Sequence, residues 1–374
     1  MKHWPTWIEI NLSDVKHNVR QIKKRIGQDV CLMLVIKANA YGHGSYKIAK
    51  AAAEAGVEKF GVASVDEAIT LRENGITQPI LILGLSLMDA IEDIVKYDVM
   101  ATVCQIDWAK MLSDEAVRQN KMACINVKVN TGMNRIGIEP EEATMFVKKI
   151  QQYPNLFIEG IFTHLATAYS EKEYVNIQFN QFKNVLENLE KEGIYIPFKH
   201  CANTGAVIND SYVYLNQVRP GLIGTTPYAA LNPRDGMDIR ECFQMKSRVV
   251  FIRKVKAGQT AGYDKLYKFE RDSIIAVVSA GWADGIPREL TNKGNVIIHG
   301  IKCPIRGRVM CDTILVDITN IPDEVKPGDE VVIIGRQCNE TISCWEWRTL
   351  LGGVSSPVTL RTFVSDRVTR RYIE

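Results

Sequence analysis

The stretch Cys31-Leu-Met-Leu-Val-Ile36 is a short apolar run, and residues 45–55 after it carry apolar side chains at spacings of three and four. The first pattern predicts a buried β-strand and the second an amphipathic helix. The same alternation continues down the chain. The further expected strands are 60–63, 80–83, 100–103, 125–129, 158–163, 195–199 and 217–218, with further helices at 65–74 and 174–192. Repeated strand–helix units predict right-handed crossovers, a parallel sheet and, with eight strands, an α/β (β/α)8 barrel of the TIM type.

The pattern changes after residue 235. Strand-like segments at 247–256, 273–279, 295–299, 314–318 and 330–334 are separated by turn residues and show little helical periodicity. This texture predicts a mainly β second domain. The strand-like start of the chain is expected to cross to that domain, with Ser13 as the N-cap of the first helix. The expected divisions are therefore an N-terminal strand (1–12), a barrel (13–235) and a C-terminal β domain (236–374).

Composition excludes several classes of protein. In 374 residues, 46 Lys and Arg against 43 Asp and Glu give a net charge of +3, which argues against a charge-driven nucleic-acid binder. Nine scattered cysteines without C-x-x-C, and no His pair at ligand spacing, predict a reduced cytoplasmic chain without a metal site. The longest apolar stretch, 80–88, is about half the length that spans a bilayer, so no membrane segment is expected in this chain. A membrane domain before Met1 in a longer protein remains an alternative.

A lysine directly follows the first strand. Lys37 is expected to point into the barrel mouth, where active sites of such barrels lie. A surface lysine whose stem covers apolar neighbours is the alternative. The small residues and glycines beside it leave room for a ligand, however. A lysine desolvated in such a place, with its pKa lowered, can form a Schiff base with a carbonyl compound.

Four other strand ends also carry polar groups. In chain order these groups are Lys128, Arg135, His164, His200, Asn203, Thr204, Arg219, Gly221 and Leu222. Backbone N–H groups at Gly221 and Leu222, and a helix that starts at Thr204, are suited to binding a phosphate. A solvated turn is the alternative for the segment from Lys128 to Arg135. Such residues at five of eight strand ends predict a ligand site at one face of the barrel.

The whole chain resembles the alanine racemase family of pyridoxal-phosphate enzymes, which combine a barrel with a β domain. The segments that carry the resemblance are 7–12, 35–44, 128–137, 160–166, 202–205, 218–221, 281–285, 307–312 and 367–370. The resemblance implies pyridoxal 5'-phosphate as the cofactor and racemisation of a small amino acid as the activity. The D-amino acid would supply peptidoglycan precursors.

The resemblance also implies roles for single residues. Lys37 would hold the cofactor as a Schiff base, His164 would support its ring, and Arg219 would face the pyridine nitrogen. Contacts to the cofactor, chiefly to its phosphate, would come from Tyr41, Asn203, Thr204, Gly221 and Leu222.

In the same way, Arg135 would orient the substrate carboxylate, beside a carbamylated Lys128. Tyr263 would be the second base, and Cys311 and Asp312 would line the substrate site. These β-domain groups would reach the barrel of a partner subunit, which implies a homodimer with shared active sites.

The chemistry suits these residue types. Racemisation removes a proton from one face of Cα and returns one to the other, so it needs two bases, here Lys37 and Tyr263. Tyr263 needs a cationic neighbour or a hydrogen bond to act as a base near neutrality. Arg219 stays charged, so it leaves the ring nitrogen unprotonated and the cofactor a weaker electron sink. We infer that this discourages transamination.

Three positions depart from the family pattern. Asp366 and Trp282 stand where the family usually has Tyr, and Cys311 stands where it has Met. The room and polarity that Asp366 and Cys311 give the substrate site favour the hypothesis of a serine racemase, with D-serine serving vancomycin resistance. A plain alanine racemase is the alternative. A barrel-type amino-acid decarboxylase fits less well because Arg219 replaces the acidic partner of the ring nitrogen, and a non-catalytic pyridoxal-phosphate-binding protein lacks the β domain.

Overall fold

The computed structural model describes residues 3–221, 224, 236–353 and 357–374. The chain divides into two compact units. One contains residues 14–40 and 45–241, and the other contains residues 1–13, 41–44 and 242–374. We call them the barrel unit and the β unit. The expected boundary at residue 235, like Leu222, lies outside the described residues.

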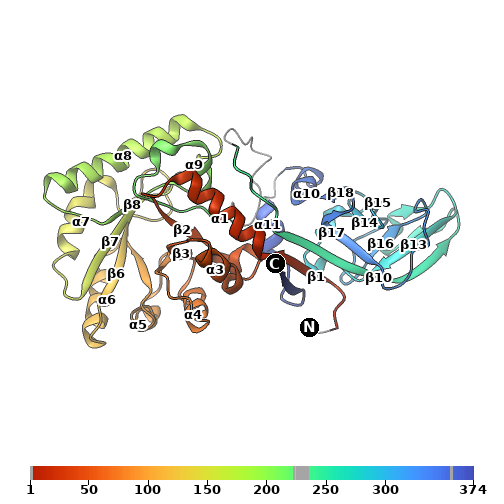
Figure 1. Ribbon diagram of the computed structural model, residues 1–374, viewed down its shortest axis with the longest axis horizontal. Helices are drawn as coiled ribbons and strands as arrows, with labels where there is room; N and C mark the ends of the chain where they lie inside the picture. Colours follow the sequence, from red (N-terminus) through yellow and green to blue (C-terminus); the bar gives the residue numbers. More distant parts are fainter. Residues whose placement is uncertain (1–2, 222–223, 225–235, 354–356) are drawn as a thin grey trace. The chain divides into compact units, whose positions relative to one another are not determined.

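Eight parallel strands form the barrel unit, as the sequence predicts (Figure 1). In spatial order they are β9 (Gln217–Val218), β2 (Cys31–Val35), β3 (Lys59–Val62), β4 (Ile80–Ile82), β5 (Met100–Val103), β6 (Ala123–Lys128), β7 (Leu156–Phe162) and β8 (Phe198–His200). The outermost strands β8 and β9 are joined just beyond their ends by a parallel bridge between Asn203 and Arg219. The sheet thus closes into a TIM-type barrel next to residues expected in the site.

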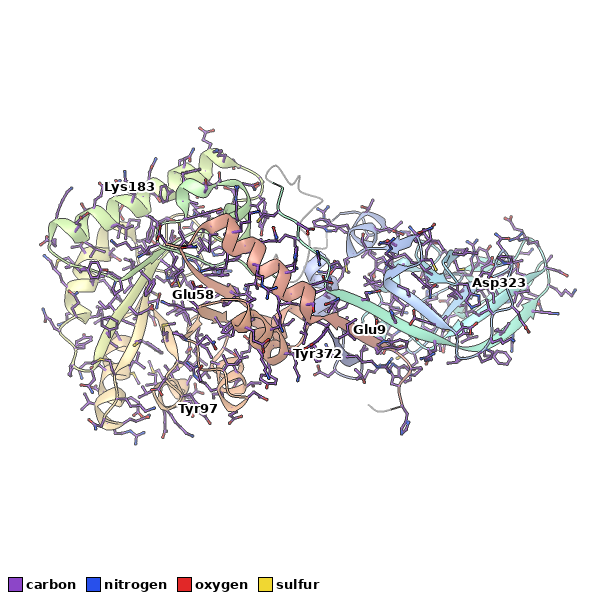
Figure 2. All side chains as sticks on the ribbon, viewed as in Figure 1. Glu9, Glu58, Tyr97, Lys183, Asp323 and Tyr372 are labelled. Atoms are coloured by element: carbon purple, nitrogen blue, oxygen red, sulfur yellow. The ribbon has the colours of Figure 1, made fainter. Side chains whose placement is uncertain are left out.

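Helices follow the strands in chain order. Their bounds are α1 (Leu12–Ile26), α3 (Ser45–Glu54), α4 (Val65–Glu73), α5 (Ile91–Lys96), α6 (Ile106–Arg118), α7 (Ala143–Ile150), α8 (Lys172–Lys191) and α9 (Thr204–Asn209), whereas the segment labelled α2 (Lys37–Tyr41) is a left-handed turn. Side chains fill the space between helices and strands (Figure 2). Met33, Leu81 and Met100, all on strands, form one buried cluster. The expected N-cap at Ser13 is wrong. Strand β1 passes directly into α1 at Leu12, so Ser13 lies inside the first turn.

The β unit contains a branched nine-stranded sheet. Its strands are β1 (Trp7–Asn11), β10 (Phe243–Val255), β13 (Ser273–Val278), β14 (Asn295–Ile298), β15 (Ile301–Pro304), β16 (Ile314–Asp317), β17 (Glu330–Gln337), β18 (Glu340–Ile342) and β19 (Thr369–Ile373). Strand β1 lies between β10 and β19 and pairs antiparallel with the first and parallel with the second. A small separate sheet pairs β11 (Thr260–Ala261) with β12 (Tyr267–Lys268).

Two short helices of the β unit, α10 (Cys344–Leu350) and α11 (Pro357–Thr362), go beyond the predicted pattern. A local signal exists for the first. Ser343 caps α10 by accepting a hydrogen bond from the Glu346 N–H, and this Ser-x-x-Glu spacing is typical of helix N-termini. Within the described part of the chain, no helix is long and apolar enough to cross a membrane.

Candidate active site

Lys37 begins a left-handed turn at the end of β2. Four consecutive residues without glycine, Ala38 to Tyr41, have φ between 51° and 54°. This conformation costs an L-residue about 1–2 kcal/mol because Cβ approaches the next carbonyl oxygen. The Glu67 carboxylate supports the turn by accepting hydrogen bonds from the Ala38 N–H at 2.5 Å and the Ala63 N–H at 2.7 Å. Strain of this kind is concentrated at functional sites, so the turn marks Lys37 as a positioned side chain.

Burial and electrostatic repulsion by the arginine side chains lower the pKa values of the two lysines of the expected site. Burial and then the Arg135 charge lower the pKa of Lys37 below its usual value. Burial lowers the pKa of Lys128 far more, with Arg219 and Arg135 adding to the effect. Among the described residues, no carboxylate forms an ion pair with these four side chains. The arrangement is therefore suited to anionic ligands, and its two lysines are shifted toward the neutral, nucleophilic amine.

His164, which follows β7, is close to the same charges. Burial, followed by repulsion from Arg219 and Lys128, lowers the pKa of His164 to about 2. The imidazole is therefore neutral across the physiological range. His164 therefore adds no positive charge to the site, and any positive charge there comes from the lysine and arginine side chains.

Arg219 is almost completely buried and faces no carboxylate among the described residues. Its guanidinium donates to His200 Nδ1 at 2.6 Å, to the Thr163 carbonyl at 2.7 Å and to the Cys201 carbonyl at 3.4 Å. Burial lowers the pKa of Arg219 to about 10, so it stays charged at neutral pH. These contacts use three of the five N–H groups of a guanidinium, which leaves donors for a ligand acceptor.

The end of the barrel at α9 brings backbone groups close together. Asn203 caps α9 by accepting from the Ala206 N–H at 3.2 Å, and the Gly221 N–H donates to Thr204 Oγ1 at 2.9 Å. A Cβ on Gly205 would lie 2.9 Å from backbone atoms of Ala168, so only glycine fits there. Thr204 and Gly221 are thus buried side by side at this end of the barrel, where the expected phosphate contacts require them to be close together. Tyr41 ends the left-handed turn and belongs to the β unit.

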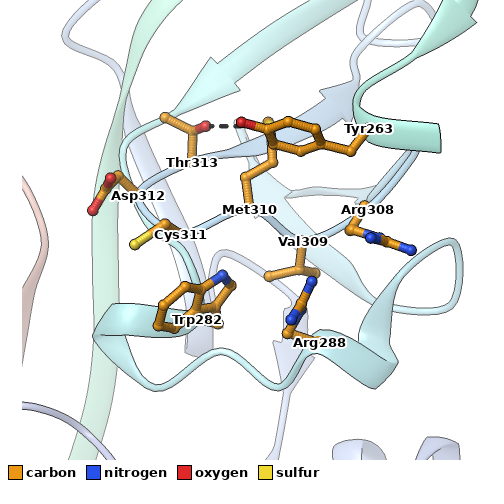
Figure 3. A pocket seen from close by; sticks show the side chains of 9 residues that line it. All are labelled: Tyr263, Trp282, Arg288, Arg308, Val309, Met310, Cys311, Asp312 and Thr313. Carbon is orange, nitrogen blue, oxygen red and sulfur yellow. Dashed lines mark hydrogen bonds between the residues drawn. The ribbon is translucent and has the colours of Figure 1, made fainter. Parts of the chain in front are cut away.

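A second set of expected site residues lines a pocket of about 530 Å³ in the β unit (Figure 3). Tyr263, Trp282, Cys311 and Asp312 all border it, and the Tyr263 hydroxyl points toward Thr313. Tyr263 is 65% exposed. Burial, and then the nearby Asp312 charge, raise the pKa of the Cys311 thiol, so it stays protonated near neutrality. Cys311 therefore lacks the lowered pKa that is typical of reactive cysteines.

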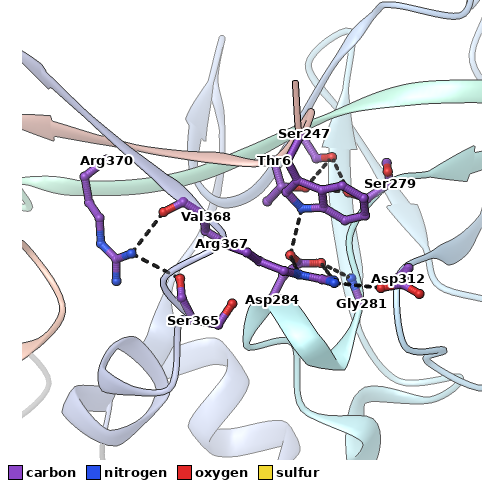
Figure 4. A network of polar contacts seen from close by, with 11 residues as sticks. Thr6, Ser247, Ser279, Gly281, Asp284, Asp312, Ser365, Arg367, Val368 and Arg370 are labelled. Carbon is purple, nitrogen blue, oxygen red and sulfur yellow. Dashed lines mark hydrogen bonds and ion pairs between the residues drawn. The ribbon is translucent and has the colours of Figure 1, made fainter. Parts of the chain in front are cut away.

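An ion-pair network that the sequence analysis missed holds one wall of this pocket (Figure 4). Arg367 binds the fully buried Asp284 through Nε at 2.7 Å and Nη2 at 2.9 Å, and Asp312 through Nη1 at 2.7 Å. The backbone N–H of Trp282 donates to the Met310 carbonyl at 3.0 Å. Arg367 belongs to one of the segments that carry the family resemblance, but the sequence analysis assigned it no role. It lies 83 residues from Asp284, so no local sequence pattern predicts the contact.

The structure thus groups the expected residues by unit. Lys37, Lys128, Arg135, His164, Asn203, Thr204, Arg219 and Gly221 lie in the barrel unit, whereas Tyr41, Tyr263, Cys311, Asp312 and Asp366 lie in the β unit. Asp366 is outside the pocket, with a fully exposed side chain 3.8 Å from Arg370. Among the described residues, no cluster of His, Cys, Asp or Glu could hold a metal ion.

A lysine with a lowered pKa at a barrel mouth, followed by a strained turn and close to cations without carboxylate partners among the described residues, defines the class of barrel enzymes that use an anionic carbonyl cofactor. The family descriptions "Alanine racemase, N-terminal domain" and "Alanine racemase, C-terminal domain" match residues 10–227 and 242–372. The chain belongs to the alanine racemase family.

Similar proteins cover nearly the whole chain. Alanine racemase 1 of Caldanaerobacter subterraneus subsp. tengcongensis is 40% identical over 98% of this chain and 95% of its own. The alanine racemase structure from Clostridium difficile 630 is 34% identical, with a TM-score of 0.93 over 99% of this chain and 96% of its own. The structure from Bacillus anthracis with bound L-Ala-P is 34% identical, with a TM-score of 0.92 over 100% of this chain and 96% of its own.

The family depends on pyridoxal phosphate, and the barrel unit fits this group. The cofactor is a phosphate dianion with an aldehyde and a ring nitrogen. The unit offers cations without carboxylate partners among the described residues, a lysine with a lowered pKa, and a buried guanidinium with donors to spare. Each part of the cofactor therefore has a chemically suited group in this unit.

Proposed function

We propose that the protein interconverts L- and D-alanine with pyridoxal phosphate as its cofactor, and so supplies D-alanine for peptidoglycan precursors. The observation that carries the proposal is Lys37, placed on a strained turn and shifted toward its neutral form by burial and by Arg135. When bound, the cofactor would supply an aldehyde for the substrate amine and an electron-withdrawing ring that acidifies the proton on Cα.

The side chains of the chain would do the rest. Lys37 would hold the cofactor and, once released from it, move the proton on one face of the substrate. Tyr263 would move the proton on the other face. Arg219 would donate to the ring nitrogen, which a guanidinium cannot protonate under ordinary conditions. His164 would support the ring as a neutral imidazole.

The remaining roles concern anions. Tyr41, Asn203, Thr204, Gly221 and Leu222 would hold the cofactor, chiefly through its phosphate. Arg135 would bind the substrate carboxylate. We also propose that Lys128 is carbamylated, because burial lowers the pKa of this amine well below its usual value and so favours the neutral form, which reacts with CO₂.

A homodimer belongs to the same proposal. The Tyr263 pocket of one subunit, with Cys311 and Asp312, would complete the barrel site of the other. We further propose a cytoplasmic location, which the free thiols of all nine cysteines support. The division into a barrel domain (13–235) and a β domain (236–374) is also proposed, and the matched family domains support it.

Alanine is a better-supported substrate than serine. The relatives described above are alanine racemases, and the exposed Asp366 offers the serine hypothesis no contact in the pocket. Comparing kcat/KM for L-alanine and L-serine tests the choice. A preference for alanine of about a hundredfold or more would exclude the serine hypothesis, because it exceeds most of what one small group in a pocket can discriminate, whereas an equal or higher kcat/KM for serine would support it.

Two variants test the base assignments. Lys37→Ala should abolish the visible absorbance of the bound cofactor. Tyr263→Phe should lose exchange of the Cα proton for one enantiomer and keep it for the other. Equal retention for both enantiomers would refute the two-base assignment, and unchanged absorbance in Lys37→Ala would refute cofactor attachment at this lysine.

A further inference from the structure

Behind Arg219, a line of polar side chains crosses the barrel unit. Arg219 donates to His200 Nδ1 at 2.6 Å, and His200 Nε2 lies 2.9 Å from Asn126 Oδ1. Asn126 Nδ2 donates to Glu159 Oε2 at 3.0 Å, and Glu159 forms an ion pair with Lys59. None of the five is more than 9% exposed. They come from β3, β6, β7, β8 and the end of β9, so the line connects five strands of the barrel.

The direction of each hydrogen bond in this line is fixed by its ends. Glu159, ionised beside Lys59, accepts only, so the Asn126 amide must turn its nitrogen to Glu159 and its oxygen to His200. His200 Nε2 must then carry the proton. At the other end the guanidinium of Arg219 can only donate, so His200 Nδ1 must carry no proton and must accept this hydrogen bond. Both ends require the same neutral tautomer of His200.

The neighbours of the line restrict its geometry. The His200 ring stacks on the Phe162 ring with parallel planes and centroids 4.9 Å apart. The Arg219 guanidinium also lies against Phe162, 4.9 Å from the centre of its ring. A Cβ on Gly160 would lie 2.1 Å from Asn126 Oδ1, so the glycine makes room for the amide. Burial, and then the Arg219 charge, lower the pKa of His200 well below its usual value. Protonation therefore does not compete with the neutral tautomer.

We propose that Asn126 is a positioning residue for Arg219. Anchored by Glu159 and Lys59, it holds His200 as the Nε2–H tautomer, and Nδ1 of that ring fixes the guanidinium plane. Arg219 then presents its remaining N–H groups in one orientation to the ring nitrogen of the cofactor. The role of the cofactor in this inference rests on the proposed function, whereas the tautomer of His200 does not.

The test uses the holoenzyme labelled with ¹⁵N-histidine. Long-range ¹H–¹⁵N spectra distinguish the two neutral tautomers and the imidazolium, and His200→Gln identifies the His200 signals among the six histidines. The wild type should show pure Nε2–H at His200. In Asn126→Leu the His200 Nε2–H loses its acceptor and the ring loses its fixed orientation, so the His200 signals should shift and broaden, and the visible absorption maximum of the bound cofactor should shift. The value of kcat should fall about tenfold or more, with KM within about twofold, because a misplaced group slows the chemical step more than binding.

Gln217→Leu is the matched control. Gln217 is another fully buried carboxamide of the barrel, but its two polar atoms have no hydrogen-bond partner among the described residues. Its replacement should leave the His200 tautomer, the absorption maximum and the kcat unchanged. If Asn126→Leu does not fold, Glu159→Gln replaces it, because a glutamine lets the Asn126 amide turn around.

The inference is overturned if wild-type His200 shows Nδ1–H or the imidazolium. It is also overturned if Asn126→Leu, or Glu159→Gln in its place, keeps the wild-type His200 signals, absorption maximum and kcat. These results are distinct from a failure of the proposed function. A wild type with the expected tautomer but no racemisation would contradict the proposed function alone, and an active wild type with an unaffected variant would contradict the positioning role alone.

Discussion

Arg367→Ala should destabilise the β unit strongly. Asp284 is fully buried and accepts four hydrogen bonds, two from Arg367, one from Trp4 Nε1 at 2.8 Å and one from the Gly281 N–H at 2.8 Å. The variant leaves this buried carboxylate with two neutral donors and no counter-charge. Breaking a buried ion pair by removing one partner costs about 3–5 kcal/mol of unfolding free energy. The stacking of the guanidinium 4.4 Å from the Trp4 ring is lost as well.

Urea unfolding followed by tryptophan fluorescence measures this effect. The signal reports mainly on the β unit, which contains five of the six tryptophans, namely Trp4, Trp7, Trp282, Trp345 and Trp347.

Arg118→Ala is the matched control. Arg118 also binds two carboxylates, those of Glu115 and Glu92, but on the exposed surface of α6. Its removal should change stability little, since solvent screens such pairs. Equal unfolding midpoints for Arg367→Ala and Arg118→Ala would refute the reasoning that burial makes the Asp284 contact important.

Three further results are expected. The folded state lowers the pKa of His200, so the unfolded state binds the extra proton as the pH falls. This group should therefore lower the free energy of unfolding by about 1.4 kcal/mol for each pH unit below about 6.5. Denaturation between pH 7 and 5 measures this slope, and a His200→Asn variant with the wild-type slope would contradict the prediction. A carbamate signal should appear in ¹³C NMR with labelled bicarbonate and vanish in Lys128→Gln but not in Lys110→Gln; a signal that survives Lys128→Gln would exclude this site. Glu67→Gln removes the charge that raises the pKa of Lys37, so the pH profile of cofactor attachment should move to lower pH, and an unmoved profile would show that Glu67 does not act on Lys37.

The barrel could be predicted because strand and helix periods alternate regularly in the sequence. The start of β8 was less clear. Apolar residues at 195–196 favoured an early strand, whereas the observed strand begins at Phe198 and Tyr195 is exposed. The last helices of the β unit were missed because each is short, although Ser343 and Glu346 had the spacing of a cap.

The polar groups at strand ends could also be found from the sequence, because chain order alone brings them to one face of a barrel. Their supports could not. The left-handed turn after Lys37 contains no glycine, and Asn39 alone among its residues is of a type that often adopts this conformation, so the sequence signal is weak. Glu67, which holds that turn, lies 29 residues from Ala38, and Asn126 lies 74 residues from His200. Contacts across such separations depend on the closed barrel and on the side-chain packing within it.

The most direct test of the central claim follows the Cα proton of alanine. The protein loaded with pyridoxal phosphate is incubated with L-alanine in D₂O, and chiral separation and ¹H NMR follow the product. The account predicts that D-alanine accumulates to an equal mixture with L-alanine while both enantiomers gain deuterium at Cα, and that removal of the cofactor stops both processes. L-Alanine that stays unexchanged and unracemised in the presence of bound cofactor would contradict the account.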